Sequence, residues 1–146
     1  MTLLEQAVSI VRGWDASRTA ERGQCLALLE LIATRMQDAL AIWQTHRDAP
    51  IEHDAKRTVT TLVRPDAAKL LNDLHYQTKD AARQLMDLTG VPFIDTFDLC
   101  EELTIELAYR QLKLGETIPY VCVKSVENQQ RRLSAVEQAL SGLRQS

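Results

Sequence analysis

The chain has 146 residues, a formal net charge of −3 and 45% apolar residues, which are the proportions of one ordinary globular domain with one core. We therefore expect a single domain over residues 1–146. Seventeen basic residues are scattered among twenty acidic ones, so the chain lacks the basic patch that binds nucleic-acid phosphates. No apolar run approaches the length of a membrane-spanning helix. We expect neither nucleic acid nor a membrane as a partner.

The cysteines indicate a reducing environment. Cys25, Cys100 and Cys122 are odd in number, far apart and without CxxC spacing, which argues against a disulfide framework, a zinc site or a redox pair. The first residues lack the basic region that opens a signal peptide. The sequence therefore predicts a cytoplasmic protein whose cysteines are reduced core residues.

The first half of the chain has helical periodicity. Thr2 and Glu5 have the spacing of a capping box, and an apolar arc follows until Gly13 weakens the helix at its end. A second helix is predicted from about Ser17 or Gln24 to His46. Its stretch "CLALLELIA" is apolar nearly all round, which predicts that this helix is covered on more than one side.

The middle of the chain contains one ambiguous element and one clear helix. Residues 51–63 have apolar positions at helical spacing, but the β-branched run "TVTTLV" leaves open whether they form a short connecting helix or an irregular segment. Pro65 suits the first turn of a helix, which extends to about Thr89 before Gly90 and Pro92 end it.

Two further helices complete the predicted fold. Asp95 is placed as the N-cap of a helix that continues to Leu114, and Thr117 and Pro119 open a last helix that reaches about Leu143. No stretch alternates with period two over enough residues to predict a strand. The sequence predicts an all-α fold: an antiparallel bundle of four main helices, a short N-terminal helix and a short connecting helix.

The last predicted helix has a narrow apolar seam on an otherwise polar surface. Gln129 interrupts the seam. Its apolar residues are Cys122, Val126, Leu133, Val136, Leu140 and Leu143. Two interpretations stay open: an outer helix lying on its own bundle, or a homodimer interface formed by Val126, Leu133, Val136, Leu140 and Leu143.

The segment "THRDAPIEHDAK", residues 45–56, has two histidines and three acids around one proline. A metal site needs ligands that converge on one point, usually as Glu-x-x-His or His-x-x-x-His patterns, and the segment has neither. Asp48 is placed to cap a helix, and Glu52 with Lys56 is a favourable i,i+4 pair. We interpret the segment as a structural corner, and we predict no metal and no cofactor.

Three polar residues fall on helix faces that should be apolar. Arg35, His75 and Glu101 each project among apolar neighbours on a different predicted helix. Burying a charge is costly unless a partner satisfies it, so Arg35 and Glu101 are a natural ion pair with His75 as a third member. We interpret the three residues as a candidate ligand-binding pocket. The alternative interpretation is that they are solvated or have a purely structural role.

The sequence has no motif of nucleotide-binding loops, serine hydrolases or zincins. Our first functional hypothesis is a non-enzymatic interaction or regulatory protein: an adaptor, an inhibitor or immunity-type binder, or a dimeric module that uses the seam. The second is a bundle that binds a small ligand at Arg35, His75 and Glu101. An enzyme, with His75 as its base, is a version of this second hypothesis.

Overall fold

The computed structural model describes residues 2–48, 65–93 and 118–145, with side chains for 2–44, 69–93 and 126–145. The elements in these ranges are α1 (Leu3–Arg12), the short 3-10 helix η1 (Ala16–Arg18), α2 (Thr19–Asp48), α3 (Pro65–Thr89) and α5 (Ile118–Arg144). No strand occurs among the described residues, and the predicted all-α class is confirmed. The predicted helices over 51–63 and 95–114 lie outside the described ranges.

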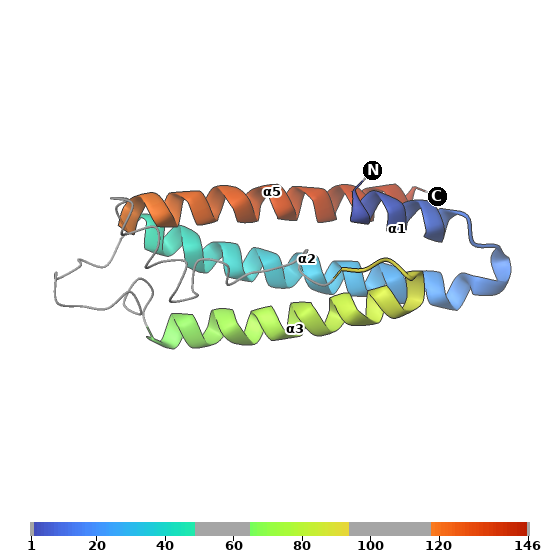
Figure 1. Ribbon diagram of the computed structural model, residues 1–146, viewed down its shortest axis with the longest axis horizontal. Helices are drawn as coiled ribbons and strands as arrows, with labels where there is room; N and C mark the ends of the chain where they lie inside the picture. The colour runs from blue at the N-terminus through green and yellow to red at the C-terminus, as the bar shows by residue number, and fades with distance from the viewer. Residues whose placement is uncertain (1, 49–64, 94–117, 146) are drawn as a thin grey trace.

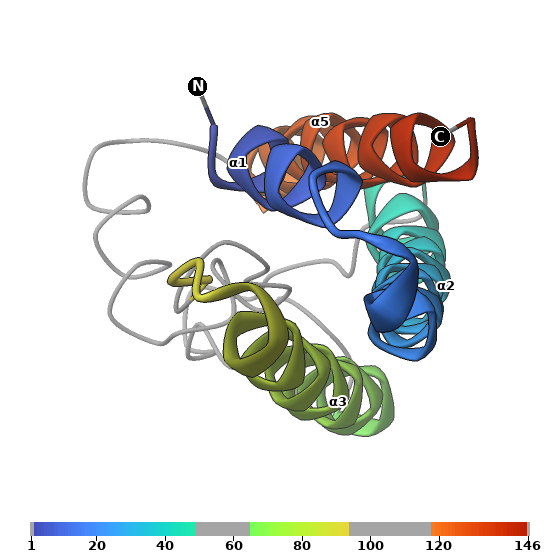
Figure 2. The same cartoon turned by 90° about the vertical axis from the view of Figure 1, so that its right-hand side faces the viewer.

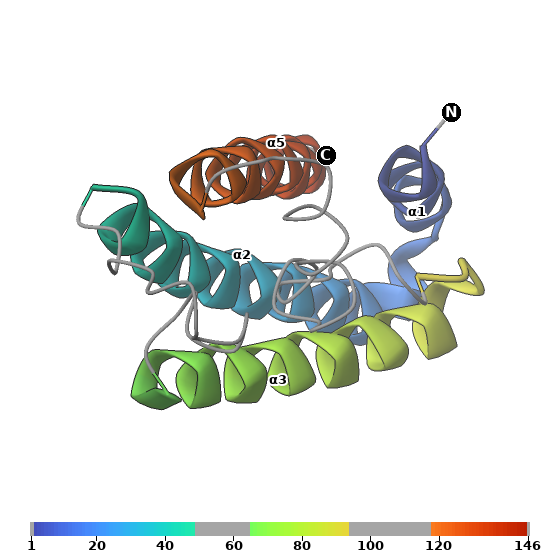
Figure 3. The ribbon, with the colours of Figure 1, turned by 60° about the vertical axis from the view of Figure 1, so that its left-hand side comes forward.

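Helix α2 is the centre of the assembly. It contacts α3 and α5, and it runs antiparallel to both (Figure 1). The end-on view in Figure 2 and the turned view in Figure 3 both show α2 between α5 and α3. The short α1 contacts α5 and, to a lesser extent, α3. The bundle arrangement expected from the sequence is therefore present in α2, α3 and α5.

Polar pairs along the α2–α5 contact define its antiparallel register. Arg144 Nη2 lies 2.9 Å from Glu30 Oε1, and Gln37 Nε2 lies 3.5 Å from Glu137 Oε1. Moving from the first pair to the second advances two helical turns along α2 and goes back two turns along α5. The two pairs therefore have the same antiparallel register along the interface.

The predicted helix ends agree with the structure at most positions. Pro65 is the first residue of α3, where its missing N–H costs no hydrogen bond. Gly90 has a φ of 75° and donates its N–H to Met86 O at 2.7 Å, which ends α3 with a left-handed residue. Before α2 the chain adds η1, a turn that the sequence analysis did not predict, and Asp15 caps it by accepting from Ser17 N at 2.9 Å.

The core lies between α2 and its neighbours. The fully buried side chains include Leu29, Ile32, Met36, Trp43, Leu71, Leu85 and Leu143. The expectation that α2 is covered on more than one side is confirmed, because it packs against both α3 and α5. Leu31 is 37% exposed, so the apolar run of α2 still leaves one edge open to solvent.

Buried polar groups in α3 are satisfied within the helix. Thr78 and Thr89 are buried, and each hydroxyl donates to the carbonyl oxygen four residues earlier, at 2.8 Å in both cases. Such back-bonding lets threonine enter an apolar interface without a partner from another element. Gln129 of α5 is also fully buried, so the polar residue that interrupts the apolar seam faces the interior with the rest of that seam.

Candidate functional site

The candidate site lies between α1 and α5 and depends on how α1 begins. Glu5 N donates to Thr2 Oγ1 at 3.1 Å, and Thr2 N donates to Glu5 Oε2 at 3.4 Å. This reciprocal capping box satisfies two amides that the first turn leaves without helical acceptors. The predicted cap is confirmed. It fixes where α1 starts.

Helix α1 attaches to the bundle through a small apolar face. Leu4, Ala7 and Val11 are buried, and they recur at the spacing of one helix face. A helix of ten residues is marginal by itself in water. Its order therefore depends on this docking.

Small residues on α5 make room for α1. Ala135, Ala139 and Gly142 follow one another at four and three residues, so they lie on one face of α5. Val8 Cγ1 lies 3.6 Å from the position that a Cβ on Gly142 would occupy, which is ordinary van der Waals contact. Because large side chains are missing from this face, α1 approaches α5 closely at Gly142.

Two arginines from other helices bind the last carbonyl groups of α5. Arg12 Nη2 of α1 donates to Gly142 O at 2.9 Å, and Arg22 Nη2 of α2 donates to Leu143 O at 3.4 Å. The last four carbonyl groups of a helix receive no hydrogen bond from an N–H of the same helix, and they carry the negative end of its dipole. The two guanidinium groups therefore cap the end of α5 and join it to α1 and α2.

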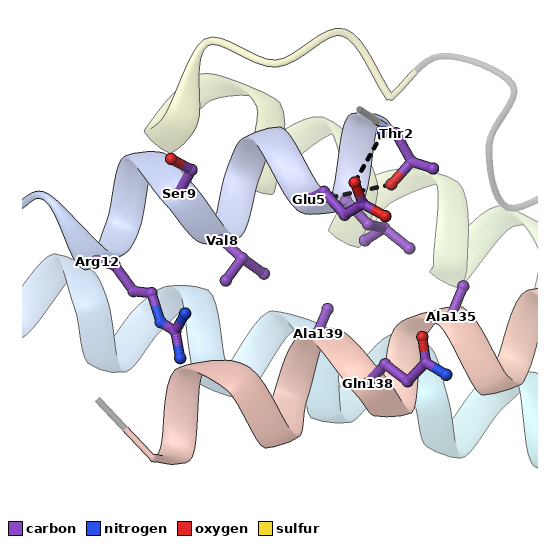
Figure 4. A pocket seen from close by; sticks show the side chains of 9 residues that line it. Thr2, Glu5, Val8, Ser9, Arg12, Ala135, Gln138 and Ala139 are labelled. Carbon is purple, nitrogen blue, oxygen red and sulfur yellow. Dashed lines mark hydrogen bonds between the residues drawn. The ribbon is translucent and has the colours of Figure 1, made fainter.

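A groove with a volume of about 550 Å³ runs between the two helices (Figure 4). Its lining residues are Thr2, Leu4, Glu5, Val8, Ser9, Arg12, Ala135, Gln138 and Ala139. The apolar side chains are all aliphatic and include two alanines, and the polar ones supply hydroxyl, amide, carboxylate and guanidinium groups. Thr2 and Ala135 lie toward one end in Figure 4, and Arg12 lies toward the other.

The chemistry of the groove is that of a binding surface. Val8 and Ala139 offer apolar contact between the helices, while Ser9 and Gln138 can donate or accept hydrogen bonds. Glu5 and Arg12 carry opposite charges, and each retains hydrogen-bonding capacity beyond its contact in the fold. This arrangement can hold a ligand that is partly apolar and carries both charges.

Arg35 and His75 each contact a residue of their own helix. Arg35 Nη1 pairs with Asp38 Oδ2 of its own helix at 3.6 Å, and its side chain is 32% exposed. His75 is half-buried, and its ring contacts the neighbouring Tyr76 edge-on with centroids 5.7 Å apart. Glu101 lies outside the described residues. The three-residue pocket therefore remains a prediction.

The seam residues of α5 pack inside the chain. Val126, Leu133, Val136, Leu140 and Leu143 are all buried in the single chain, and α5 contacts α2 and α1. This is the arrangement of a helix lying on its own bundle. A homodimer through these five side chains would first have to expose them, and it remains a prediction.

Neither a metal cluster nor a membrane span is found in the described part of the chain. Its His, Cys, Asp and Glu residues form no group of three that could hold a metal ion. Of the helices that the structure describes, none combines the length and apolar character needed to cross a bilayer. Residues 49–56 of the segment 45–56 fall outside the described ranges, so the interpretation as a corner remains a prediction.

A charged cluster at the start of α2 serves the turn between α1 and α2. The Arg18 guanidinium lies 3.8 Å above the Trp14 ring, and its Nε donates to Glu21 Oε2 at 3.0 Å. The hydrogen bonds from Arg18 hold the pKa of Glu21 below its usual value. One turn further on, Cys25 is fully buried, and burial raises the pKa of its thiol to about 11. A thiol that stays protonated is a poor nucleophile at neutral pH.

Comparison with known protein families, curated proteins and solved structures returned no match. The candidate site therefore depends on geometry alone. The groove was not predicted from the sequence, although the small residues Ala135, Ala139 and Gly142 on one face of α5 are a signal for close helix approach. That signal does not identify which helix approaches.

Proposed function

We propose that the protein is an interaction module that binds a segment of another protein in the groove between α1 and α5. The observation that carries the proposal is the groove itself, with its volume of about 550 Å³ and its mixed apolar and charged lining. Val8, Ala135 and Ala139 can receive apolar anchors, and Glu5 and Arg12 can pair with charges beside them. Helix-in-groove recognition of this kind uses anchors spaced by three or four residues.

The lining favours a peptide over a compact small molecule. Pockets for small molecules are lined mainly by hydrophobic and aromatic side chains that enclose the ligand. The nine lining residues of this groove include no aromatic residue. They come from α1, its N-cap and α5, so the contact surface follows α1 for about three turns and α5 for about one turn. A peptide segment uses such an extended surface better than a compact ligand.

We propose the cytoplasm as the setting of this function. Cys25 is a free, buried thiol, which suits a reducing compartment. Purification under reducing conditions should accordingly leave a folded protein that is competent to bind.

The test fills the groove without changing its charges. Ala135 is exposed in the groove, so Ala135→Leu adds a larger side chain there and keeps a good helix former. Ser134→Leu is the matched control, because Ser134 is also exposed on α5 but does not line the groove. A displayed library of random peptides is selected on the wild-type protein, and the enriched peptides are then measured on all three proteins by fluorescence anisotropy.

Enriched peptides should bind the wild type with dissociation constants in the micromolar range, about 8 kcal/mol of binding free energy. Ala135→Leu should weaken them by about tenfold or more, and Ser134→Leu by less than about twofold. Peptides that bind wild type and Ala135→Leu equally well would show that the groove is not the binding surface. A selection that enriches no peptide would also count against the proposal.

A small-ligand site near Arg35 is a second candidate function. Arg35 Nε is buried and has no hydrogen-bond acceptor among the described residues, and an acidic ligand group could supply one. The test compares His75→Ala and Glu101→Gln with the wild type in thermal melts against a library of small carboxylates and phosphates. If neither substitution changes the melting temperature or any ligand response, this candidate is wrong.

A further inference from the structure

Two opposite charges mark the two ends of the groove. Glu5 and Arg12 both line it, and their seven-residue separation on α1 corresponds to about 10 Å along the helix axis. Figure 4 shows Glu5 near the Thr2 end and Arg12 near the opposite end, with Val8 and Ala139 between them. A bound segment therefore meets a negative group at one end and a positive group at the other.

We propose that the preferred occupant is an amphipathic helix of a partner protein that lies antiparallel to α1, with an acidic residue near its N-terminus and a basic residue near its C-terminus. This inference rests on the proposed function and adds the direction and charge pattern of the partner. The acid meets Arg12, the base meets Glu5, and apolar anchors between them contact Val8 and Ala139.

The helix dipole selects this direction over its reverse. Acidic residues stabilise the first turn of a helix and basic residues stabilise the last. A helix with that common pattern places its acid beside Arg12 and its base beside Glu5 only when its N-terminus lies beside Arg12. In the reverse direction its acid faces Glu5 and its base faces Arg12, so both pairs are repulsive. Helices α1 and α5 run in the same direction, so the occupant would be antiparallel to both.

The spacing defines the partner further. Its acid and base should lie about seven residues apart on one face, matching the separation of Glu5 and Arg12. The anchors between them should fall three and four residues after the acid. Small or medium aliphatic anchors suit the groove best, because Val8 and the two alanines leave space for methyl and isobutyl groups.

The experiment uses two synthetic peptides of identical composition, each about four helical turns long. Both carry the same alanine and leucine anchors. One has Glu at the N-terminal charge position and Lys at the C-terminal one, and the other has these two residues exchanged. Anisotropy titrations use the full-length wild type and the double variant Glu5→Gln/Arg12→Gln. Gln at position 5 keeps the capping box while removing the charge.

Further variants separate the effect of charge on peptide binding from any effect of the substitutions on the fold. Arg12→Lys keeps the positive charge and should keep the peptide preference, even where the bond to Gly142 O weakens. Ala135→Leu reports whether binding occurs in the groove, and Ser134→Leu is again the matched control. Circular dichroism of each variant confirms that the helices are retained. Light scattering of the protein alone reports whether a second copy occupies the groove.

We expect the acid-first peptide to bind the wild type about fivefold more tightly at low ionic strength, with the ratio approaching one at about 1 M salt. The double variant should bind both peptides equally. Equal or reversed affinities on the wild type, with both peptides weakened by Ala135→Leu, would overturn this inference and leave the groove proposal intact. Binding that is unaffected by Ala135→Leu, or no binding, would contradict both. A dimer that Ala135→Leu dissociates would identify a second copy as the occupant and overturn the inference.

Discussion

Arg12 donates a hydrogen bond from Nη2 to the backbone carbonyl oxygen of Gly142, 2.9 Å away and 130 positions later in the chain. The bond joins the last turn of α1 to the last turn of α5. It also satisfies one of the carbonyls that α5 leaves without a helical donor. One side chain therefore closes one end of the groove and stabilises the helix that forms its other wall.

Removing this bond should destabilise the fold measurably. Arg12→Ala takes away a charged donor from an exposed helix end, and we expect the free energy of unfolding to fall by about 1 to 2 kcal/mol. Urea denaturation followed by circular dichroism measures it. Arg131→Ala is the control, because Arg131 is an exposed arginine like Arg12 but lies on α5. This substitution should change stability by less than about 0.5 kcal/mol. Equal effects of the two substitutions would contradict the role given to Arg12.

The capping box should control the local stability of α1. Thr2→Ala removes the acceptor for Glu5 N, and we expect a loss of about 1 kcal/mol. Hydrogen exchange should show faster exchange of the amides of α1, because this short helix opens before the bundle. Glu5→Gln keeps both bonds of the box and should leave exchange nearly unchanged. Uniform acceleration across α2 and α3 would argue against a separately opening α1.

Cys25 should make the protein less stable at alkaline pH. Burial raises the pKa of the folded thiol from 9.0 to about 11, so as pH rises above 9 the unfolded chain loses this proton first. The stability that the protonated Cys25 thiol gives the folded state is complete below pH 9 and is lost as pH rises through 11. By linkage it falls by about 1.4 kcal/mol at a pH midway between the two values.

Cys25→Ala isolates this effect from other titrating groups. The stability of the wild type relative to the variant should fall by about 1.4 kcal/mol between pH 8 and a pH near 10, as measured by urea denaturation at each pH, so the order of the two stabilities should reverse. The variant should also be less stable at pH 8 by about 1 kcal/mol because of the cavity it leaves. A difference that does not depend on pH would show that the thiol is not protected by the fold.

The ion pair between Glu30 and Arg144 should contribute little. Both side chains are more than half exposed, and such pairs are screened by solvent and salt. A double-mutant cycle with Glu30→Ala and Arg144→Ala should give a coupling energy below about 1 kcal/mol that falls further in high salt. A coupling several times larger would mean that this contact holds α5 in place.

Local chemistry in the sequence predicts most of the helix ends. The Thr2–Glu5 box, Pro65 at the start of α3 and Gly90 after its end all act within a few residues, so their spacing is enough to predict them. The buried face of α5 is predicted for the same reason, because its periodicity places Val126 and Leu133 on one side.

Contacts between distant residues could not be predicted in this way. The bond from Arg12 to Gly142 O depends on the angle at which α1 returns along α5. Periodicity identifies a buried face but not the helix that covers it, so the seam of α5 was also compatible with a dimer. Arg35 illustrates a further limit, because periodicity places its side chain on an apolar face but does not show that it also reaches its own helix neighbour Asp38.

The most direct test of the groove is the nuclear Overhauser effect between the methyl groups of Val8 and the α protons of Gly142. The contact at this point is 3.6 Å, measured from Val8 Cγ1 to the position of a Cβ on Gly142. We expect a clear cross-peak in the wild-type protein in solution, since protons within about 5 Å give one when the packing is fixed. If the cross-peak is missing while α5 remains helical, α1 does not lie along α5 and the groove does not exist.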